Sequence, residues 1–308
     1  MQTELGGPIT VETIPVHYAY VARYSYTDTV VQNDNFLRLS PFADNHQTPG
    51  PCNVATFPQG RQVQYPDRLG NTVHRVRVTT PHHELIIAAT GKVCLNHLAV
   101  GASDVALADV ALADIAYGLE AQEFLSASRL ADPVGVVDVV RDAGAAAPTL
   151  LETVDNVVQW IYANVRYERG HTSVNTTAAD VLVSMRGVCQ DQAHLCLAML
   201  RALSIPARYV SGLLTRQPGE THAWIEFLHP HLGWLPADPT RGVVIDLGVD
   251  YLKFGIGRDY SEVPPVSGSF ISRGDGHLDF TTAEVFFDRD TISIDDALEL
   301  LRSDPTTP

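Results

Sequence analysis

The sequence predicts an α+β protein in which an N-terminal antiparallel β-sandwich-like domain precedes a core made of a buried helix and an antiparallel sheet. Three observations support this prediction. Residues 14–100 hold short, partly alternating segments separated by Pro and Gly turns, as in a sandwich. Residues 190–203 are apolar around most of a helical circumference, which is typical of a buried helix. The segments after that helix have the pattern of successive strands and lack the helix–strand alternation of a parallel sheet.

Composition restricts the class of protein before any motif is considered. The 308 residues are 45% hydrophobic and 19% charged, with a formal net charge of -15, which fits a globular protein with excess acid. Such a surface opposes binding to nucleic acid or to an anionic membrane. We find no long uninterrupted apolar run, no secretory signal and no disulfide framework among the four cysteines, so we expect a cytoplasmic location.

The first 100 residues are expected to form an N-terminal β domain. Strands are predicted at 17–26 and 71–80, where apolar and polar residues partly alternate. Residues 83–95 are predicted to form a pair of strands, broken at Gly91. Together these segments suggest a sandwich of about ninety residues.

Residues 101–148 are expected to form a helical linker. Alanine and leucine are dense in 104–125 and favour helix, and Asp132-Pro133 is a stop signal. A two-copy ALAD repeat in this stretch is too short for a repeat architecture.

A core domain is expected to span residues 149–295, with a tail at 296–308. Apolar residues at helical spacing predict a helix over 149–164, followed by a short one over 180–185 and the buried one over 190–203. Strands are then predicted at 207–214, 222–228 and 233–239, and less regular ones at 269–272 and 283–288.

The stretch that suggests chemistry is Arg186 to Asp191, where Cys189 lies at the entry to the buried helix. Free N–H groups and the positive dipole end at a helix N-terminus stabilise a thiolate and an oxyanion. The alternative is a small buried apolar side chain, which is the common role of an unpaired cysteine. This motif alone leaves both interpretations open.

Two further motifs favour catalysis. His222 begins a predicted strand after a polar turn, and Asp238 ends the next strand. If these strands form a hairpin, the imidazole and the carboxylate lie side by side at its open end. An activated cysteine needs such a base and such an orienting acceptor.

The order Gly-Val-Cys-Gln-Asp, then His-Ala-Trp, then Asp-Pro-Thr resembles the transglutaminase-like superfamily of papain-like cysteine enzymes. Residues 254–268 resemble a run found in the bacterial members, many of which are described as proteases. Residues 35–41 and 67–71 resemble their β-rich N-terminal domain. The resemblance covers most of residues 15–290 and implies a papain-like, transglutaminase-type core.

By this resemblance, Cys189 is the nucleophile, His222 the general base and acid, and Asp238 the residue that orients the imidazole. The backbone N–H of Cys189 is one expected oxyanion donor. Trp160 or Tyr167 is a candidate for a side-chain donor, although an aromatic residue in this region is more often part of the core. No cofactor and no metal are implied.

Other polar residues near these motifs have simpler interpretations. Asp191 is expected to hold the nucleophile loop at the helix N-terminus, and His194 is expected to be a core histidine. His82-His83-Glu84 and the pair His229 and His231 are expected to be solvated loop residues, since no HExxH motif is present.

The sequence therefore predicts a cysteine-dependent hydrolase of protease or amidase type, acting on a protein or peptide substrate. Transamidation, which joins two proteins, is the alternative; it needs a site that keeps water from the thioester. A catalytically silent scaffold is a third possibility, and the N-terminal domain could serve as a binding module. The sequence gives no indication of oligomeric state.

Overall fold

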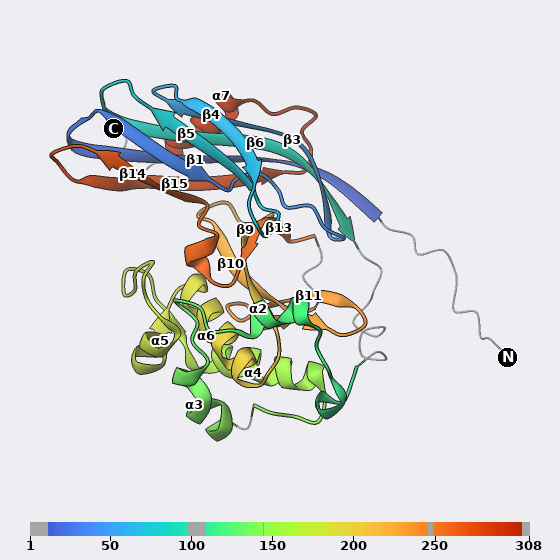
Figure 1. Cartoon of the computed structure of the whole chain (residues 1–308). Coiled ribbons are helices and arrows are strands. Elements are labelled where there is room, and N and C mark those ends of the chain that lie inside the picture. The colour runs from blue at the N-terminus through green and yellow to red at the C-terminus, as the bar shows by residue number, and fades with distance from the viewer. Residues whose placement is uncertain (1–11, 98–108, 144, 246–248, 304–308) are drawn as a thin grey trace.

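The computed structural model describes residues 12–97, 109–143, 145–245 and 249–303. Two stacked β-sheets form one end of the molecule, a further sheet lies in the middle, and helices cover the other end (Figure 1). This arrangement confirms the predicted α+β class.

The N-terminal domain is a sandwich of two antiparallel four-stranded sheets, in the orders β15-β1-β6-β3 and β14-β2-β5-β4. Buried apolar side chains from both sheets form one core between them. The strands from the first part of the chain are β1 (Glu12–Val30), β2 (Gln32–Leu37), β3 (Gln47–Phe57), β4 (Arg61–Pro66), β5 (Thr72–Val78) and β6 (His82–His97).

The sandwich is completed from the far end of the chain. Strand β14 (Val266–Ile271) pairs with β2, and β15 (Gly276–Phe286) pairs with β1. Helix α7 (Ile294–Glu299) buries Ala297 against Ala19 and Ala88 of β1 and β6. The expected boundaries of a core at 149–295 and a tail at 296–308 therefore need correction: residues 266–303 belong to the sandwich as far as they are described. The expected tail's last residues, 304–308, lie outside the described residues.

The predicted break at Gly91 is wrong, because β6 is one continuous strand. Gly91 lies within it, opposite Tyr18 of β1. A Cβ atom at this position would lie 2.6 Å from the Tyr18 ring. The glycine therefore makes room for a buried aromatic ring and does not mark a turn.

The helical or helix-rich character expected of residues 104–125 is wrong over most of the part that the structure describes. Only short turns form, at Leu112–Asp114 and Leu119–Ala121, followed by α2 (Gln122–Leu125); residues 104–108 lie outside the described residues. The backbone of Val110 and Leu112 instead bonds to that of Leu150 and Pro148. These tertiary bonds use the groups that a helix would have needed.

The helical half contains α3 (Val137–Asp142), α4 (Leu150–Asn164), α5 (Ala178–Ser184) and α6 (Cys189–Ala202). Three of these helices follow the predictions for 149–164, 180–185 and 190–203, and α3 lies in the expected linker. Residues 191–201 of α6 are all buried. The apolar face of α4, which carries Val154 and Ile161, packs in the same cluster as α6.

Helix α6 packs against an antiparallel five-stranded sheet in the order β12-β11-β10-β9-β13. The strands are β9 (Ala207–Leu214), β10 (His222–His229), β11 (Gly233–Asp238), β12 (Val243–Val244) and β13 (Tyr251–Gly257). Two short parallel strands, β7 (Arg166–Tyr167) and β8 (Arg186–Gly187), precede α6. The predicted strands 207–214, 222–228 and 233–239 are confirmed, and β13 was missed.

Side chains of the sandwich cover the outer edge of β13. The Gln47 amide donates to the Lys253 carbonyl at 2.7 Å and accepts from the Lys253 N–H at 2.9 Å. Asn71 makes the same pair of bonds to Ile256, both at 2.8 Å. Two amide side chains thus take the place of a neighbouring strand, and the sandwich and the core share a buried interface.

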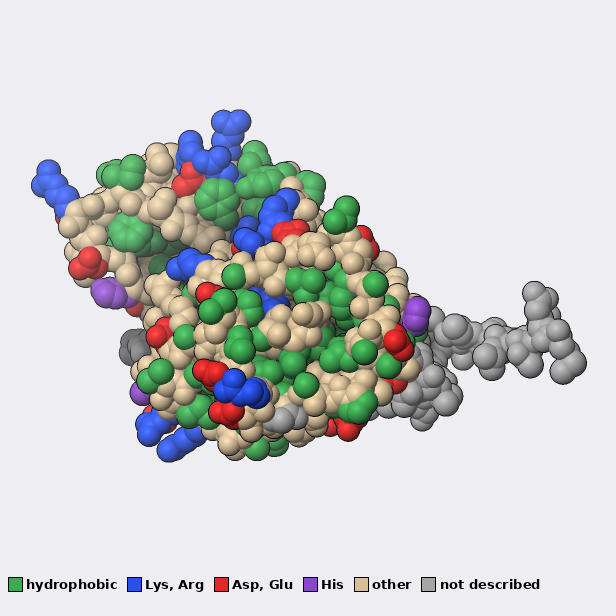
Figure 2. Space-filling view, turned by 60° about the horizontal axis from the view of Figure 1, so that its bottom comes forward, with side chains coloured by type: hydrophobic (Ala, Val, Ile, Leu, Met, Phe, Trp, Pro, Cys, Tyr) green, Lys and Arg blue, Asp and Glu red, His purple; other side chains and the backbone are tan. Residues whose placement is uncertain are grey.

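The helical end of the molecule has a mixed surface. In Figure 2, Lys and Arg side chains and Asp and Glu side chains are interspersed on this face, around scattered hydrophobic ones. No broad basic patch appears on the described part of this face. Within the described ranges, we find no helix with the length and apolarity that a membrane span requires.

Candidate active site

Cys189 is the first residue of α6, and its entry loop is fixed by Asp191. The buried Asp191 carboxylate accepts a bond from the Val188 N–H at 2.7 Å and one from the Thr172 hydroxyl at 2.6 Å. This confirms the expected role of Asp191 in holding the nucleophile loop. A Cβ atom on Gly187 would lie 2.6 Å from the Asp191 Cβ, so the loop and the carboxylate fit only with glycine there.

The hairpin of β10 and β11 positions the other two predicted residues. His222 begins β10 and Asp238 ends β11. The His222 Nε2 donates to Asp238 Oδ2 at 2.7 Å, and the Cys189 side chain lies near enough to the same imidazole to raise its pKa. Since Nε2 is taken by the carboxylate, Nδ1 is the nitrogen available to the sulfur. The structure therefore brings Cys189, His222 and Asp238 into one row, in which Cys189 and His222 line the same pocket and His222 is hydrogen-bonded to Asp238.

Asp238 is fully buried and held by further donors. The Tyr251 hydroxyl donates to its Oδ2 at 2.6 Å, and the Thr240 N–H donates to its Oδ1 at 2.9 Å. The Arg241 guanidinium in turn donates to the Tyr251 hydroxyl at 3.0 Å. Sequence reasoning missed Tyr251 and Arg241, because neither residue stands at a regular spacing from Asp238 that would predict contact with it.

An aromatic group holds the imidazole from the side. The Trp224 ring lies nearly parallel to the His222 ring, with centroids 6.2 Å apart, and Tyr251 packs edge-on against Trp224. A Cβ atom on Gly212 would lie 2.6 Å from the Trp224 ring and 2.1 Å from the Leu252 carbonyl oxygen. The absence of a side chain at Gly212 therefore leaves room for the Trp224 ring, which packs against His222, and for the close approach of β13.

The environment of His222 favours its cationic form. Burial alone lowers the pKa of an imidazole, but the hydrogen bonds to Asp238 and Cys189 and the charges on both raise it further than burial lowers it. The resulting pKa of His222 is about 9. At neutral pH the Cys189 sulfur therefore faces an imidazolium.

These groups open into a pocket of about 340 Å³. Cys189, His222 and Tyr167 line it, together with Leu278 and Thr281 of β15. Of the two candidate oxyanion donors, Tyr167 thus lies at the pocket, whereas Trp160 packs against the core cluster of the helices. Burial raises the pKa of Tyr167, so its hydroxyl keeps its proton and can donate it in a hydrogen bond.

Three histidines outside this row are buried in the fold. His194 is fully buried, and its Nε2 accepts a bond from the Tyr260 N–H at 3.2 Å, which confirms the expected core role. His82 and His229 were expected to be solvated, and this was wrong: both are buried within strands. His82 bonds to Asn33 at 2.8 Å. No cluster that could hold a metal occurs among the described residues.

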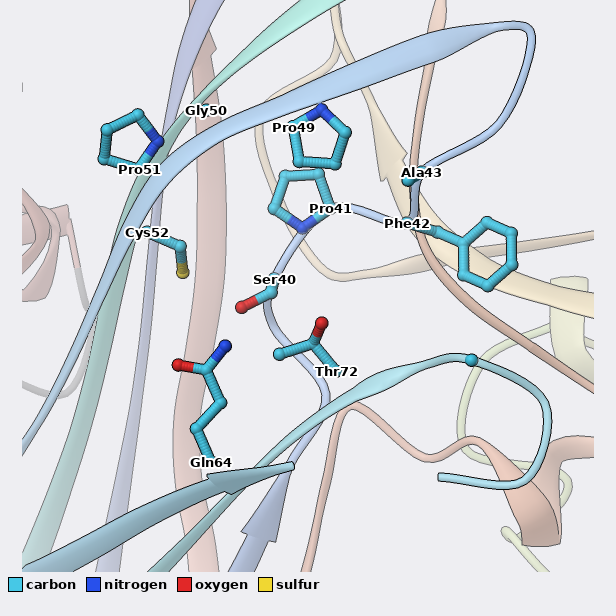
Figure 3. A pocket seen from close by; sticks show the side chains of 11 residues that line it. Ser40, Pro41, Phe42, Ala43, Pro49, Gly50, Pro51, Cys52, Gln64 and Thr72 are labelled. Carbon is cyan, nitrogen blue, oxygen red and sulfur yellow. The ribbon is translucent and has the colours of Figure 1, made fainter. Parts of the chain in front are cut away.

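A second thiol lies in a different kind of pocket. Cys52, Ser40, Gln64 and Thr72 point into a cavity of about 360 Å³ in the sandwich (Figure 3). The Cys52 sulfur lies 3.1 Å from the Tyr18 hydroxyl, and burial raises the pKa of this thiol. Cys52 is therefore a protonated, hydrogen-bonded thiol at neutral pH.

Two family models match the chain. The transglutaminase-like superfamily model matches residues 138–239, and the bacterial transglutaminase-like N-terminal region matches residues 16–94. The crystal structure of a "putative cysteine protease" from Cytophaga hutchinsonii shares the fold, with a TM-score of 0.75 at 21% identity over 92% of this chain and 93% of that one.

Relatives by sequence include proteins with and without a described activity. An uncharacterised protein of Mycobacterium leprae is 31% identical over 83% of this chain and 93% of its own length. A protein-glutamine gamma-glutamyltransferase of Pseudomonas aeruginosa is 33% identical over 25% of this chain and 14% of that protein. From the two family models and the long match to the mycobacterial protein, we conclude that the chain belongs to the transglutaminase-like superfamily and carries the N-terminal region of its bacterial members.

Proposed function

We propose that the protein is a cysteine-dependent hydrolase that cleaves peptide, amide or isopeptide bonds through a thioester on Cys189. The observation that carries the proposal is the row of Cys189, His222 and the buried Asp238 beside a pocket, with the imidazole hydrogen-bonded to the carboxylate. The name of the Cytophaga hutchinsonii protein supports the same class of reaction.

The first half-reaction forms the thioester. The Cys189 thiolate attacks the carbonyl carbon of the scissile bond, and the electron pair of the C=O bond moves to oxygen. The Cys189 backbone N–H, at the start of α6, and the Tyr167 hydroxyl are the proposed donors to this oxyanion. His222 then gives its Nδ1 proton to the leaving nitrogen, the C–N bond breaks, and the amine departs.

The second half-reaction consumes water. The now neutral His222 takes a proton from a water molecule as that water attacks the thioester carbon. Collapse of the second oxyanion breaks the C–S bond and releases the carboxylic acid. The thiolate and the imidazolium are restored, so one amide and one water yield one acid and one amine.

The test measures the release of new amino groups when the protein is incubated with denatured β-casein. A second assay treats the protein with chloroacetamide and identifies the alkylated cysteine by mass spectrometry. We expect the Cys189→Ala variant to lose this activity, and the Cys52→Ser variant to retain it. We also expect chloroacetamide to label Cys189 before Cys52 at pH 7. Cleavage that persisted in a folded Cys189→Ala variant would contradict the proposal.

Transamidation is a second candidate, supported by the name of the Pseudomonas aeruginosa relative. It uses the same thioester, with an amine in place of water. Incubation of β-casein with dansylcadaverine separates the two reactions. Dansyl transfer to glutamine side chains indicates transamidation, whereas new termini or free acid without dansyl transfer indicate hydrolysis.

A further inference from the structure

The pocket at Cys189 is bounded on one side by the sandwich, through strand β15. We propose that the outer edge of β15 binds the backbone of an extended substrate segment next to the scissile bond. This inference rests on the proposed function. The substrates are then peptide chains, and small free amides are poor substrates.

Strand β15 is an edge strand, and its edge already binds extended backbone at one place. It pairs with β1 on one side only. On the other side, the Gly219 N–H donates to the Ala283 carbonyl at 3.0 Å, and the Ala283 N–H donates to the Gly219 carbonyl at 2.6 Å. The backbone groups of Ala283 therefore point away from β1, toward the core.

The same geometry leaves the backbone of Thr281 available. Alternate residues of an antiparallel strand bond to the same side, so the N–H and C=O of Thr281 point outward, as those of Ala283 do. Continued pairing would place Thr221 opposite Thr281, but the bridge at Gly219 is an isolated one. Both threonines line the pocket, so the outward backbone groups of Thr281 border a space that a ligand can occupy.

This space lies beside the reacting groups. Thr281 and Leu278 line the same pocket as Cys189 and His222. A bound backbone at Thr281 is therefore close to the thiol. An irregularity in the pairing of β1 with β15 lies between Leu278 and Phe280, and such bulges end regular pairing. The edge can thus pair with only two or three residues of an extended segment.

The side chains of β15 that line the pocket also suggest which substrate side chains are preferred. Leu278 is 51% exposed, and as a pocket-lining residue it offers an apolar contact to a substrate side chain. Main-chain bonds supply affinity in this mode of recognition, and side-chain contacts supply selectivity. We therefore expect extended segments with an apolar residue near the scissile bond.

The experiment compares two reagents that alkylate Cys189. One is a set of acetyl-tripeptidyl chloromethyl ketones with Ala, Leu, Phe or Gln beside the reactive group; the other is chloroacetamide. The quantity measured is the rate of alkylation by each peptidyl chloromethyl ketone divided by the rate of alkylation by chloroacetamide. Mass spectrometry confirms that Cys189 is the alkylated residue. For the wild-type protein we expect at least one peptidyl reagent to give a ratio about 10-fold above its ratio toward free cysteine.

Removing the outward donor should abolish this preference. Thr281→Pro eliminates the outward N–H, whereas the neighbours of Thr281 make the bonds to β1, so edge positions of this kind tolerate proline. We expect the ratio to fall about 10-fold in Thr281→Pro and to stay at the wild-type value in Thr282→Ala. Chloromethyl ketones N-methylated at the peptide nitrogens should show the same loss on the wild-type protein, which tests the proposal even if the proline variant does not fold.

The outcomes separate the two proposals. Equal ratios for wild-type protein and free cysteine, or N-methylated reagents as fast as their parents, would overturn binding at β15 and leave the hydrolase proposal standing. Failure of both reagents to alkylate Cys189 would count against the hydrolase proposal itself.

Discussion

At the scale of single residues, the buried Asp238 determines the charge of His222. The ordinary pKa of histidine is 6.5, and in this protein that of His222 is about 9. Because the pKa is raised in the folded state, the stabilisation from the imidazolium is complete below pH 6.5 and is lost as the pH rises through about 9. Activity that needs the imidazolium should decline over the same upper range.

We therefore expect Asp238→Asn to move the alkaline limb of the pH–rate profile from about 9 toward 6.5. Its maximal kcat/KM should fall about 100-fold, since a poorly oriented acid–base group loses an effect of this size. The measurement is kcat/KM between pH 5 and 10. Asp142→Asn, at an exposed carboxylate, is the control. An unchanged alkaline limb in Asp238→Asn would show that this carboxylate does not govern the histidine.

Sequence reasoning identified the three residues of the row because each lies in a short local motif at the end of an element. It did not find Tyr251, which bonds to Asp238 from β13. Neither Tyr251 nor Thr172 belongs to a periodic or capping pattern. Their contacts arise only when distant segments pack together, so no local signal could have identified them.

At the scale of elements, the turn between β8 and α6 has no spare volume. A Gly187→Ala methyl would meet Asp191 at 2.6 Å, and overpacking of this kind costs about 1–3 kcal/mol. Because Asp191 holds the loop that carries Cys189, we also expect activity to fall about 100-fold. Denaturant unfolding and kcat/KM measure the two effects.

Gly135→Ala is the matched control for this variant. Its added methyl would meet Ala179 at 3.4 Å, an ordinary contact. We expect this control to keep both stability and activity near wild-type values. A Gly187→Ala variant as active as the control would mean that the loop relaxes without moving the sulfur.

Three strands of the core sheet are joined by a buried charge cluster. Glu226 of β10 bonds to Arg208 of β9 and to Lys253 of β13. Burial raises the pKa of Glu226, but the two cations more than offset this and lower it from 4.5 to about 2. Because the pKa is lowered in the folded state, the stabilisation is present above pH 4.5 and is lost as the pH falls toward 2.

A difference of this size in pKa corresponds to about 3 kcal/mol. We expect Glu226→Gln to be less stable than wild type by about this amount at pH 6, and the gap to narrow below pH 4.5. Urea unfolding at several pH values measures it. Asp138→Asn, at an exposed pair, should change little. A gap that stayed constant down to pH 3 would rule out titration of Glu226 as its source.

The elements that were predicted correctly are those in which one local pattern determines burial. The apolar faces of α4 and α6 and the segments of β9, β10 and β11 are of this kind. The helical structure expected at 104–125 is mostly absent from the described part of this segment. The backbone of Val110 and Leu112 is instead hydrogen-bonded to that of Leu150 and Pro148. Composition records a preference for helix but does not record these competing bonds.

At the scale of the whole molecule, both ends of the chain form one sandwich. Strand β1 has β15 on one side and β6 on the other. The sequence suggested an N-terminal unit of 100 residues, because local patterns identify strands and do not reveal which distant strand pairs with them. Residues 1–100 alone lack both β14 and β15, so this fragment is not a complete domain.

We expect a chain ending at Val263 to fail to reach a stable fold, because β1 and β2 lose their edge partners. Loss of near-ultraviolet circular dichroism and of soluble yield would record this failure. Supplying residues 264–303 as a separate chain should restore folding and the labelling of Cys189. A stable, fully labelled 1–263 chain would show that the last strands are dispensable.

Pairing of His17 with Phe286 also has a consequence for synthesis of the protein. During synthesis, β1 leaves the ribosome long before its partner β15 has been made. The sandwich can therefore fold completely only after β15 has emerged. Since Leu278 and Thr281 of that late strand line the pocket at Cys189, a nascent or prematurely terminated chain has an unfinished reaction chamber. We expect the pocket wall that Leu278 and Thr281 form beside Cys189 to be present only after β15 has been synthesised.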